Sequence, residues 1–169
     1  MTTIRQAEFP GDAALVRGLF DAYVAFLVGR VAPEVAGPVL AKYPPQRRAE
    51  AVDGFARLHA PPRGALLLAE ADGMPLGCGM MRMLEPGIAE LQRIYVAPEA
   101  RGRGLGRRLT ETLVARAAEA GATRVRLDTG RGLIEAQALY RDLGFREVPP
   151  YHDDYPDLQP HLVFYERVL

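Results

Sequence analysis

Hydrophobic positions in the first third of the chain recur at helical spacing. The apolar stripe that predicts a helix between Asp12 and Gly29 consists of Leu15, Leu19, Ala22 and Phe26. Asp12 is of a residue type that caps helix N-termini, and Gly29 is of the type that ends helices. A weak alternation over 4–8 predicts a short strand before this helix, and an apolar stripe over 44–60 predicts a second helix after it.

The pattern then changes to short apolar runs separated by turn signals. Runs over 65–69, 76–84 and 88–96 have the length of strands, and the dipeptide Asp72-Gly73 between the first two is typical of hairpins. Three consecutive strands with short connections predict an antiparallel meander.

From residue 101 the order becomes loop, helix, strand, helix, strand. The expected elements are helices over 105–121 and 136–143 and strands over 125–127 and 161–168. Together with the meander they predict an α+β fold, with a mixed, mainly antiparallel central sheet flanked by helices and a βαβ unit near its centre. We expect a single domain over 1–169.

Composition excludes several classes of protein. The chain has 169 residues, of which 49% are apolar, so it is long enough for one packed core and too apolar for disorder. Its 21 basic and 21 acidic residues leave no positive field for a nucleic-acid partner. No secretory signal and no run of 18 apolar residues is present, which predicts a cytoplasmic protein without a membrane partner.

Cysteine and histidine usage argues against disulfides and metal. The single cysteine, Cys78, lies among apolar and glycine neighbours, so we expect a buried, unreactive thiol. The three histidines, His59, His152 and His161, lie far apart and have no cysteine partners, so no metal is expected.

A glycine-rich loop follows the strand that ends at Val96 and leads into a helix. Glycines at 102, 104 and 106 allow a ligand close to the backbone, and the first amides of a helix attract anions. Nearby positive charge comes from Arg101, Arg103, Arg107 and Arg108. The loop is therefore a predicted diphosphate cradle. It lacks the Gly-Lys-Ser/Thr ending of a P-loop, and Arg107 and Leu109 replace the third glycine of a dinucleotide fingerprint.

Two motifs resemble a known family. The first reads Val96-x-Pro98-x-x-Arg101-Gly102-x-Gly104-x-Gly106-x-x-Leu109, and the second reads Ala136-x-x-Leu139-Tyr140-x-x-x-Gly144-Phe145. In this order and separation they resemble the GNAT superfamily of N-acetyltransferases, whose signature Gln/Arg-x-x-Gly-x-Gly/Ala is matched by Arg101, Gly104 and Gly106. The resemblance covers residues 64–148 and implies the GNAT fold, with a splayed strand pair at the acetyl-CoA site.

The resemblance implies acetyl-CoA as the acyl donor and assigns residues to it. The loop residues implied to bind the pyrophosphate are Arg101, Gly102, Arg103, Gly104, Leu105, Gly106 and Arg107. The strand end over Ile94, Tyr95 and Val96 would pair with the pantetheine arm like an added strand, and Ala136 is the remaining cofactor-binding residue. The resemblance also divides the domain into three segments. They are an N-terminal strand with acceptor-side helices over 1–62, an acetyl-CoA-binding core over 63–148, and a loop with the last strand over 149–169.

The same resemblance suggests catalytic residues. Tyr140 matches a tyrosine that protonates the leaving thiolate, although its place on an apolar stripe also fits core packing. Glu90 resembles the glutamate that some members use as a base through a water, and a strand salt bridge, for example to Arg93, is the alternative. Leu133 stands where many members carry Asn, which removes one hydrogen bond to the cofactor arm.

The acceptor is expected on the side of the site opposite acetyl-CoA, near the polar loop over 149–160. Its acids and aromatics suit a cationic amine, whether of a small molecule or of a peptide, although an ordinary acidic surface loop is the alternative. A dyad of His152 with its neighbour Asp153 is disfavoured, because adjacent loop residues rarely face each other. The predicted function is acetyl transfer to a primary amine by direct attack in a ternary complex. A non-catalytic acyl-CoA sensor is the alternative, and the resemblance also allows a homodimer.

Overall fold

A computed structural model describes all residues, 1–169. Its strands are β1 (Thr3–Gln6), β2 (Gly64–Ala71), β3 (Met74–Glu85), β4 (Ile88–Val96), β5 (Arg124–Gly130), β6 (Arg146–Val148) and β7 (Leu162–Val168). Its helices are α1 (Ala13–Arg30), α2 (Pro33–Lys42), α3 (Arg48–Leu58), α4 (Leu105–Glu119) and α5 (Ile134–Asp142), with short 3-10 turns at Pro45–Arg47, Pro98–Ala100 and Gln159–His161. None of the helices has the length and apolar character needed to cross a membrane.

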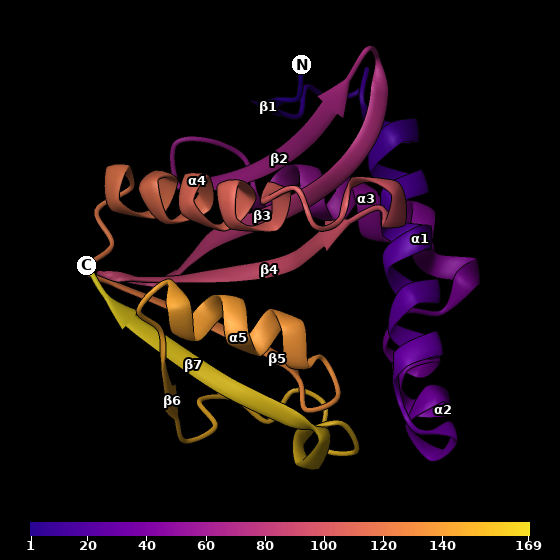
Figure 1. Cartoon of the computed structure of the whole chain (residues 1–169), viewed down its shortest axis with the longest axis vertical. Coiled ribbons are helices and arrows are strands. Elements are labelled where there is room, and N and C mark those ends of the chain that lie inside the picture. Colours follow the sequence, from indigo (N-terminus) through magenta and orange to yellow (C-terminus); the bar gives the residue numbers. More distant parts are fainter.

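The strands form one sheet in the order β1-β2-β3-β4-β5-β7-β6 (Figure 1). Only β4 and β5 run parallel, joined by the crossover through α4, and every other neighbouring pair is antiparallel. This confirms the predicted α+β class, the meander of β2, β3 and β4, and the βαβ unit.

Helices cover both faces of the sheet, so the core has two parts. On one face α4 and α5 pack against alternate strand residues such as Leu67, Leu91 and Leu127. On the other face α1, α2 and α3 pack against Leu66 and Leu68. The run of five apolar residues in β2 is explained by this sandwich, because a central strand buried on both faces has no polar side.

Two irregularities of β4 shape the site. Its pairing with β5 is confined to Ile88–Glu90 opposite Arg124–Arg126, and beyond these residues the two strands diverge (Figure 1). Its pairing with β3 contains a bulge, at which two residues, Arg93 and Ile94, lie opposite the single residue Gly79. Arg93 takes a positive φ of 51°, a left-handed conformation that is uncommon for residues other than glycine.

Four local expectations are corrected. Helix α2 begins at Pro33 and contains Pro38, and it lies between the two helices that the sequence predicts, where no helix was expected. A proline is tolerated at the first turn because its missing N–H would have no partner there. The short strand β6 was not expected, and α1 ends at Arg30 rather than Gly29. Asp12 occupies the predicted N-cap position but does not cap the helix, because its carboxylate accepts hydrogen bonds from Arg5 and from the amide of Glu8.

Candidate active site

A cavity of about 530 Å³ lies where β4 and β5 diverge. Its sheet walls are Leu91 to Ile94 on β4 and Leu127 to Gly130 on β5, and its other walls come from α1, α2, α5 and the glycine loop. Of the sequence-predicted site residues, those that line the cavity are Ile94, Arg101, Gly102, Ala136 and Tyr140. The volume is within the usual range for small-molecule sites, roughly 300–1,000 Å³.

The glycine loop borders this cavity with free amides. None of the backbone N–H groups of residues 102–107 donates a hydrogen bond within the protein. Gly102 and Gly104 have φ angles of 73° and 74°, and Gly104 is the N-cap residue of α4. The unpaired amides and the positive end of α4 therefore have the geometry and charge that favour an anion here, and binding of a diphosphate stays a prediction.

The predicted strand end is partly turned away from the cavity. Tyr95 is buried on the other face of the sheet, where its ring contacts Tyr23 and Phe26 at centroid distances of 6.3 and 6.0 Å. Val96 accepts a hydrogen bond at its carbonyl from Arg101 Nε at 3.0 Å. The side chain of Arg101 is thereby held at the end of β4, and only Ile94 of this strand end lines the cavity.

Tyr140 reaches the cavity from α5. Its ring packs against Phe145 and Tyr165 at centroid distances of 5.9 and 6.3 Å, and the residue is only 7% exposed. The hydroxyl makes no hydrogen bond within the protein, although it lines the cavity. Burial, with the negative charge of Asp128 as a smaller cause, raises the pKa of the phenol, so it stays protonated at neutral pH.

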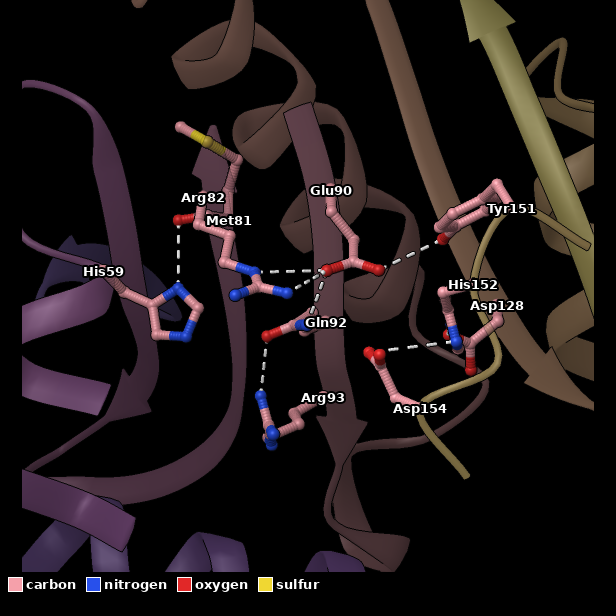
Figure 2. Close-up of polar contacts among 10 residues, drawn as sticks. All are labelled: His59, Met81, Arg82, Glu90, Gln92, Arg93, Asp128, Tyr151, His152 and Asp154. Carbon is pink, nitrogen blue, oxygen red and sulfur yellow. Dashed lines mark hydrogen bonds and ion pairs between the residues drawn. The ribbon is translucent and has the colours of Figure 1, made fainter. Parts of the chain in front are cut away.

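Glu90 is buried at the centre of a polar network (Figure 2). Its Oε2 accepts hydrogen bonds from Arg82 at 3.1 and 3.2 Å and from Gln92 Nε2 at 2.6 Å. Its Oε1 accepts one from the hydroxyl of Tyr151 at 3.1 Å. The strand salt bridge considered for this residue is therefore present, with Arg82 rather than Arg93 as the partner, and Glu90 does not itself line the cavity.

Beside this network lies a histidine–aspartate pair that sequence reasoning missed. His152 Nε2 lies 2.9 Å from Asp128 Oδ2, and this hydrogen bond is the main reason why the pKa of His152 is raised above its ordinary value. Asp128 lines the cavity from β5, whereas His152 comes from the loop after β6. The two residues are 24 positions apart, so no local spacing could reveal the pair. The expectation that His152 would not pair with Asp153 agrees with this geometry.

Carboxylate and imidazole groups from three elements converge here. Glu90, Asp128 and His152 each offer an atom within 4.8 Å of the others, which is the donor set of a divalent-metal site. The guanidinium of Arg82, however, forms an ion pair with Glu90 at 3.1 Å, and its positive charge would repel a metal cation bound to the same carboxylate. Glu90 therefore already has a positively charged partner, which a carboxylate free to bind a metal ion would lack.

Comparison with known proteins identifies the family. A model described as the acetyltransferase (GNAT) family matches residues 31–145 of the chain. The chain belongs to this family. An uncharacterised N-acetyltransferase of Schizosaccharomyces pombe is 35% identical over 105 residues, covering 60% of this chain and 64% of the relative. An IAA acetyltransferase of Azospirillum brasilense is 37% identical over 111 residues, covering 65% and 71% of the two chains.

Solved structures share the fold over the whole chain. A GNAT acetyltransferase of Staphylococcus aureus superposes with a TM-score of 0.77 at 16% identity, covering 100% of this chain and 99% of that one. A Salmonella typhimurium protein solved with its cofactor acetyl-CoA gives 0.72 at 19% identity, covering 100% and 94%. These structures confirm the predicted fold, and the family model with the curated relatives confirms the predicted family and class of enzyme, an acetyl-CoA-dependent acyltransferase.

Proposed function

We propose that this GNAT acetyltransferase moves an acetyl group from acetyl-CoA to a primary amine of a small molecule or peptide by direct attack in a ternary complex. The observation that carries the proposal is the continuity of the glycine loop and the cavity. Free amides suited to a diphosphate border the same hollow that Tyr140 lines from α5. Family membership and the fold shared with a protein solved with acetyl-CoA support it.

The pyrophosphate of acetyl-CoA binds at the amides of residues 102–107, and the pantetheine arm lies between the diverging strands. Leu91 and Ile94 on β4 and Gly130 on β5 border this space. The backbone of β4 beyond Glu90 has no partner on the β5 side, so it is free to pair with the amide groups of the arm. The thioester then lies near Tyr140, with the acceptor approaching from the side of α1 and α2.

In the reaction, the amine nitrogen attacks the thioester carbon to form a C–N bond. The C–S bond breaks, and the electron pair leaves with the sulfur. Tyr140 donates its phenolic proton toward that sulfur, since its hydroxyl has no other partner and stays protonated. No covalent intermediate on the protein is needed. Cys78 is 2% exposed, and burial raises the pKa of its thiol to about 12, so it is not a nucleophile.

The amine must lose a proton before or during attack. We assign this proton to the cluster of Glu90, Asp128 and His152, each of which offers a carboxylate oxygen or a ring nitrogen within 4.8 Å of the others. Asp128 is the member that borders the cavity, and its hydrogen bond to His152 allows a proton to pass inward. Glu90 remains the proposed base through a water, and its charge also favours a protonated His152.

The whole chain acts as one catalytic unit in this proposal. Helices of the segment 1–62 form the acceptor-side wall, the segment 63–148 holds the loop and diverging strands, and the segment 149–169 brings Tyr151 and His152 to Glu90 and Asp128. We place the reaction in the cytoplasm, where a free buried thiol such as Cys78 is stable.

The test is an amine screen with thiol release as the readout. Purified protein, acetyl-CoA and a panel of primary amines should give amine-dependent release of CoA together with an acetylated product detected by mass spectrometry. The control is Arg116→Gln, which changes an exposed ion pair on α4 away from the cavity and should leave the rate unchanged. Tight binding of acetyl-CoA without turnover on any amine would contradict the proposal and favour an acyl-CoA sensor.

A further inference from the structure

The cavity wall contains an arginine without a counter-ion. Four basic side chains line the cavity: Arg30, Lys42, Arg93 and Arg101. Only Arg30 pairs with a carboxylate, that of Glu135 at 2.7 Å. Arg101 is held by the carbonyl of Val96 and covers the ring of Phe26 at 4.5 Å. Arg101, Arg93 and Lys42 therefore have no counter-ion within the protein. Because Arg101 belongs to the glycine loop proposed for the pyrophosphate, Arg93 and Lys42 are the positive charges left for the acceptor.

Arg93 is held rigidly but its hydrogen-bonding capacity is mostly unused. Its guanidinium lies 4.4 Å from the ring centroid of Phe55 and 5.7 Å from that of Tyr43, and Nη1 donates to Gln92 Oε1 at 2.7 Å (Figure 2). Its Nε is buried and has no partner. A guanidinium offers five N–H donors in a planar fork, and an unpaired buried donor is costly. Because Nε is buried, the donors open to a ligand are those of the terminal nitrogens, and Nη2 makes no hydrogen bond within the protein. These free donors point to an anionic ligand.

The bulge in β4 is what places this arginine in the cavity. Regular alternation would put Gln92 and Arg93 on opposite faces of the sheet, with Arg93 on the face of Leu91 that packs against α4. The extra residue and the φ of 51° turn Arg93 to the face of Gln92 and Phe55 instead. A strained backbone that aims a charged side chain at a cavity is typical of a binding site.

Lys42 reinforces the positive charge near Tyr43. Its Nζ lies 5.3 Å from the ring centroid of Tyr43 and 4.2 Å from that of Tyr155, and it forms no ion pair. The aromatic rings hold both cations without neutralising them. Asp128, with His152, supplies the negative charge elsewhere in the same cavity. The cavity thus presents separate positive and negative groups to the acceptor.

We propose, resting on the acetyltransferase function above, that the acceptor is a small amine that also carries a carboxylate, such as a free amino acid, and that Arg93 binds that carboxylate. The planar fork of a guanidinium matches a carboxylate through two parallel hydrogen bonds. The amine is then directed to the side of Asp128 and the thioester. The pantetheine arm must share the cavity of about 530 Å³, which leaves space for a compact acceptor.

Matched acceptors test this in the unmodified enzyme. Each amino acid in the panel is compared with its primary amide and with its decarboxylated amine, at saturating acetyl-CoA. A carboxylate bound by Arg93 should raise kcat/KM by roughly 10- to 100-fold over both analogues, the range of a charged hydrogen-bonded pair. A phosphonate analogue distinguishes a planar carboxylate from any anion, and it should be the poorer substrate. Equal or better turnover of the uncharged or phosphonate analogues would overturn the proposal.

Variants test the assignment to Arg93. Arg93→Gln should lose roughly 10- to 100-fold in kcat/KM for the amino acid while changing that for the decarboxylated amine little, so the preference disappears. Arg93→Lys keeps the charge without the fork and should retain an intermediate preference. Arg116→Gln is the control, and retention of acetyl-CoA affinity shows that each variant is folded. An unchanged preference in Arg93→Gln would refute the role of Arg93, whereas absence of turnover on every amine by the unmodified enzyme would instead refute the acetyltransferase function.

Discussion

Replacing Tyr140 by phenylalanine is the sharpest test of the proposed chemistry. The ring would keep its packing against Phe145 and Tyr165, and the hydroxyl makes no hydrogen bond within the protein. The substitution therefore removes one group that faces the cavity and leaves the fold intact. A hydrogen bond to a charged group contributes about 1.5–3 kcal/mol, so losing the bond to the forming thiolate should lower kcat by roughly 10- to 150-fold.

The measurement is thiol release at saturating acetyl-CoA and acceptor, with acetyl-CoA affinity determined separately by calorimetry. Affinity should stay within about twofold, because the bond exists only as the sulfur gains charge. Tyr165→Phe is the matched control. Its hydroxyl is buried without a partner, so the change should leave kcat unaltered and raise the stability by about 1–3 kcal/mol. A kcat for Tyr140→Phe within twofold of the unmodified enzyme would refute the acid role and leave Tyr140 as a packing residue.

Four further outcomes are expected. Gly104→Val should abolish acetyl-CoA binding in calorimetry, because its φ of 74° is strained for a β-branched residue, so the backbone that carries the loop amides must change conformation; retained micromolar affinity would contradict the cradle. The rate should rise with pH through an inflection above the ordinary histidine value of 6.5, as the raised pKa of His152 requires, and His152→Gln should remove that inflection. Asp12→Asn should lower the free energy of unfolding, measured with denaturant at pH 7, by about 1–2 kcal/mol after allowance for the partly exposed Arg5. Because Arg5 lowers the pKa of Asp12 from 3.8 to about 2, this difference between the variant and the unmodified protein should be present above pH 3.8 and lost as the pH falls through 2. Dialysis against a metal chelator should leave turnover unchanged, since Arg82 opposes a cation at Glu90, and loss of activity restored by a divalent ion would show the opposite.

The residues whose role depends on local sequence were predictable. The glycine loop and the start of α4 are recognisable from consecutive residues in the sequence. The continuous apolar run of β2 likewise indicates a strand. Helix α2 was missed because Pro38 opposes a helix locally, whereas packing of Val35 and Val39 into the core favours it. Tertiary burial outweighed local propensity there.

The acceptor side was much less predictable, because it depends on contacts between distant segments. His152 and Asp128 come from a loop and a strand that only the folded chain brings together, and Tyr151 donates a hydrogen bond to Glu90 from 61 positions further along the chain. The bulge at Arg93 leaves no local signal, since an arginine at positive φ looks like any other strand arginine in the sequence. A site made of backbone amides lies within one segment and can be predicted from its sequence. A site made of side chains from several segments can be predicted only once the fold is known.

The bulge and the diverging strands are best understood as one device. A bulge increases the twist of its strand, and β4 leaves β5 after Glu90, just before the bulge at Arg93 and Ile94. The separation proposed to hold the thioester arm is thus next to the backbone change that turns Arg93 toward the proposed acceptor site. Deleting Ile94 should restore regular pairing between β3 and β4. This one change should both narrow the space between β4 and β5 and return Arg93 to the face of the sheet that packs against α4. Donor binding and acceptor preference should therefore be lost in the same variant, although the two sites use different residues.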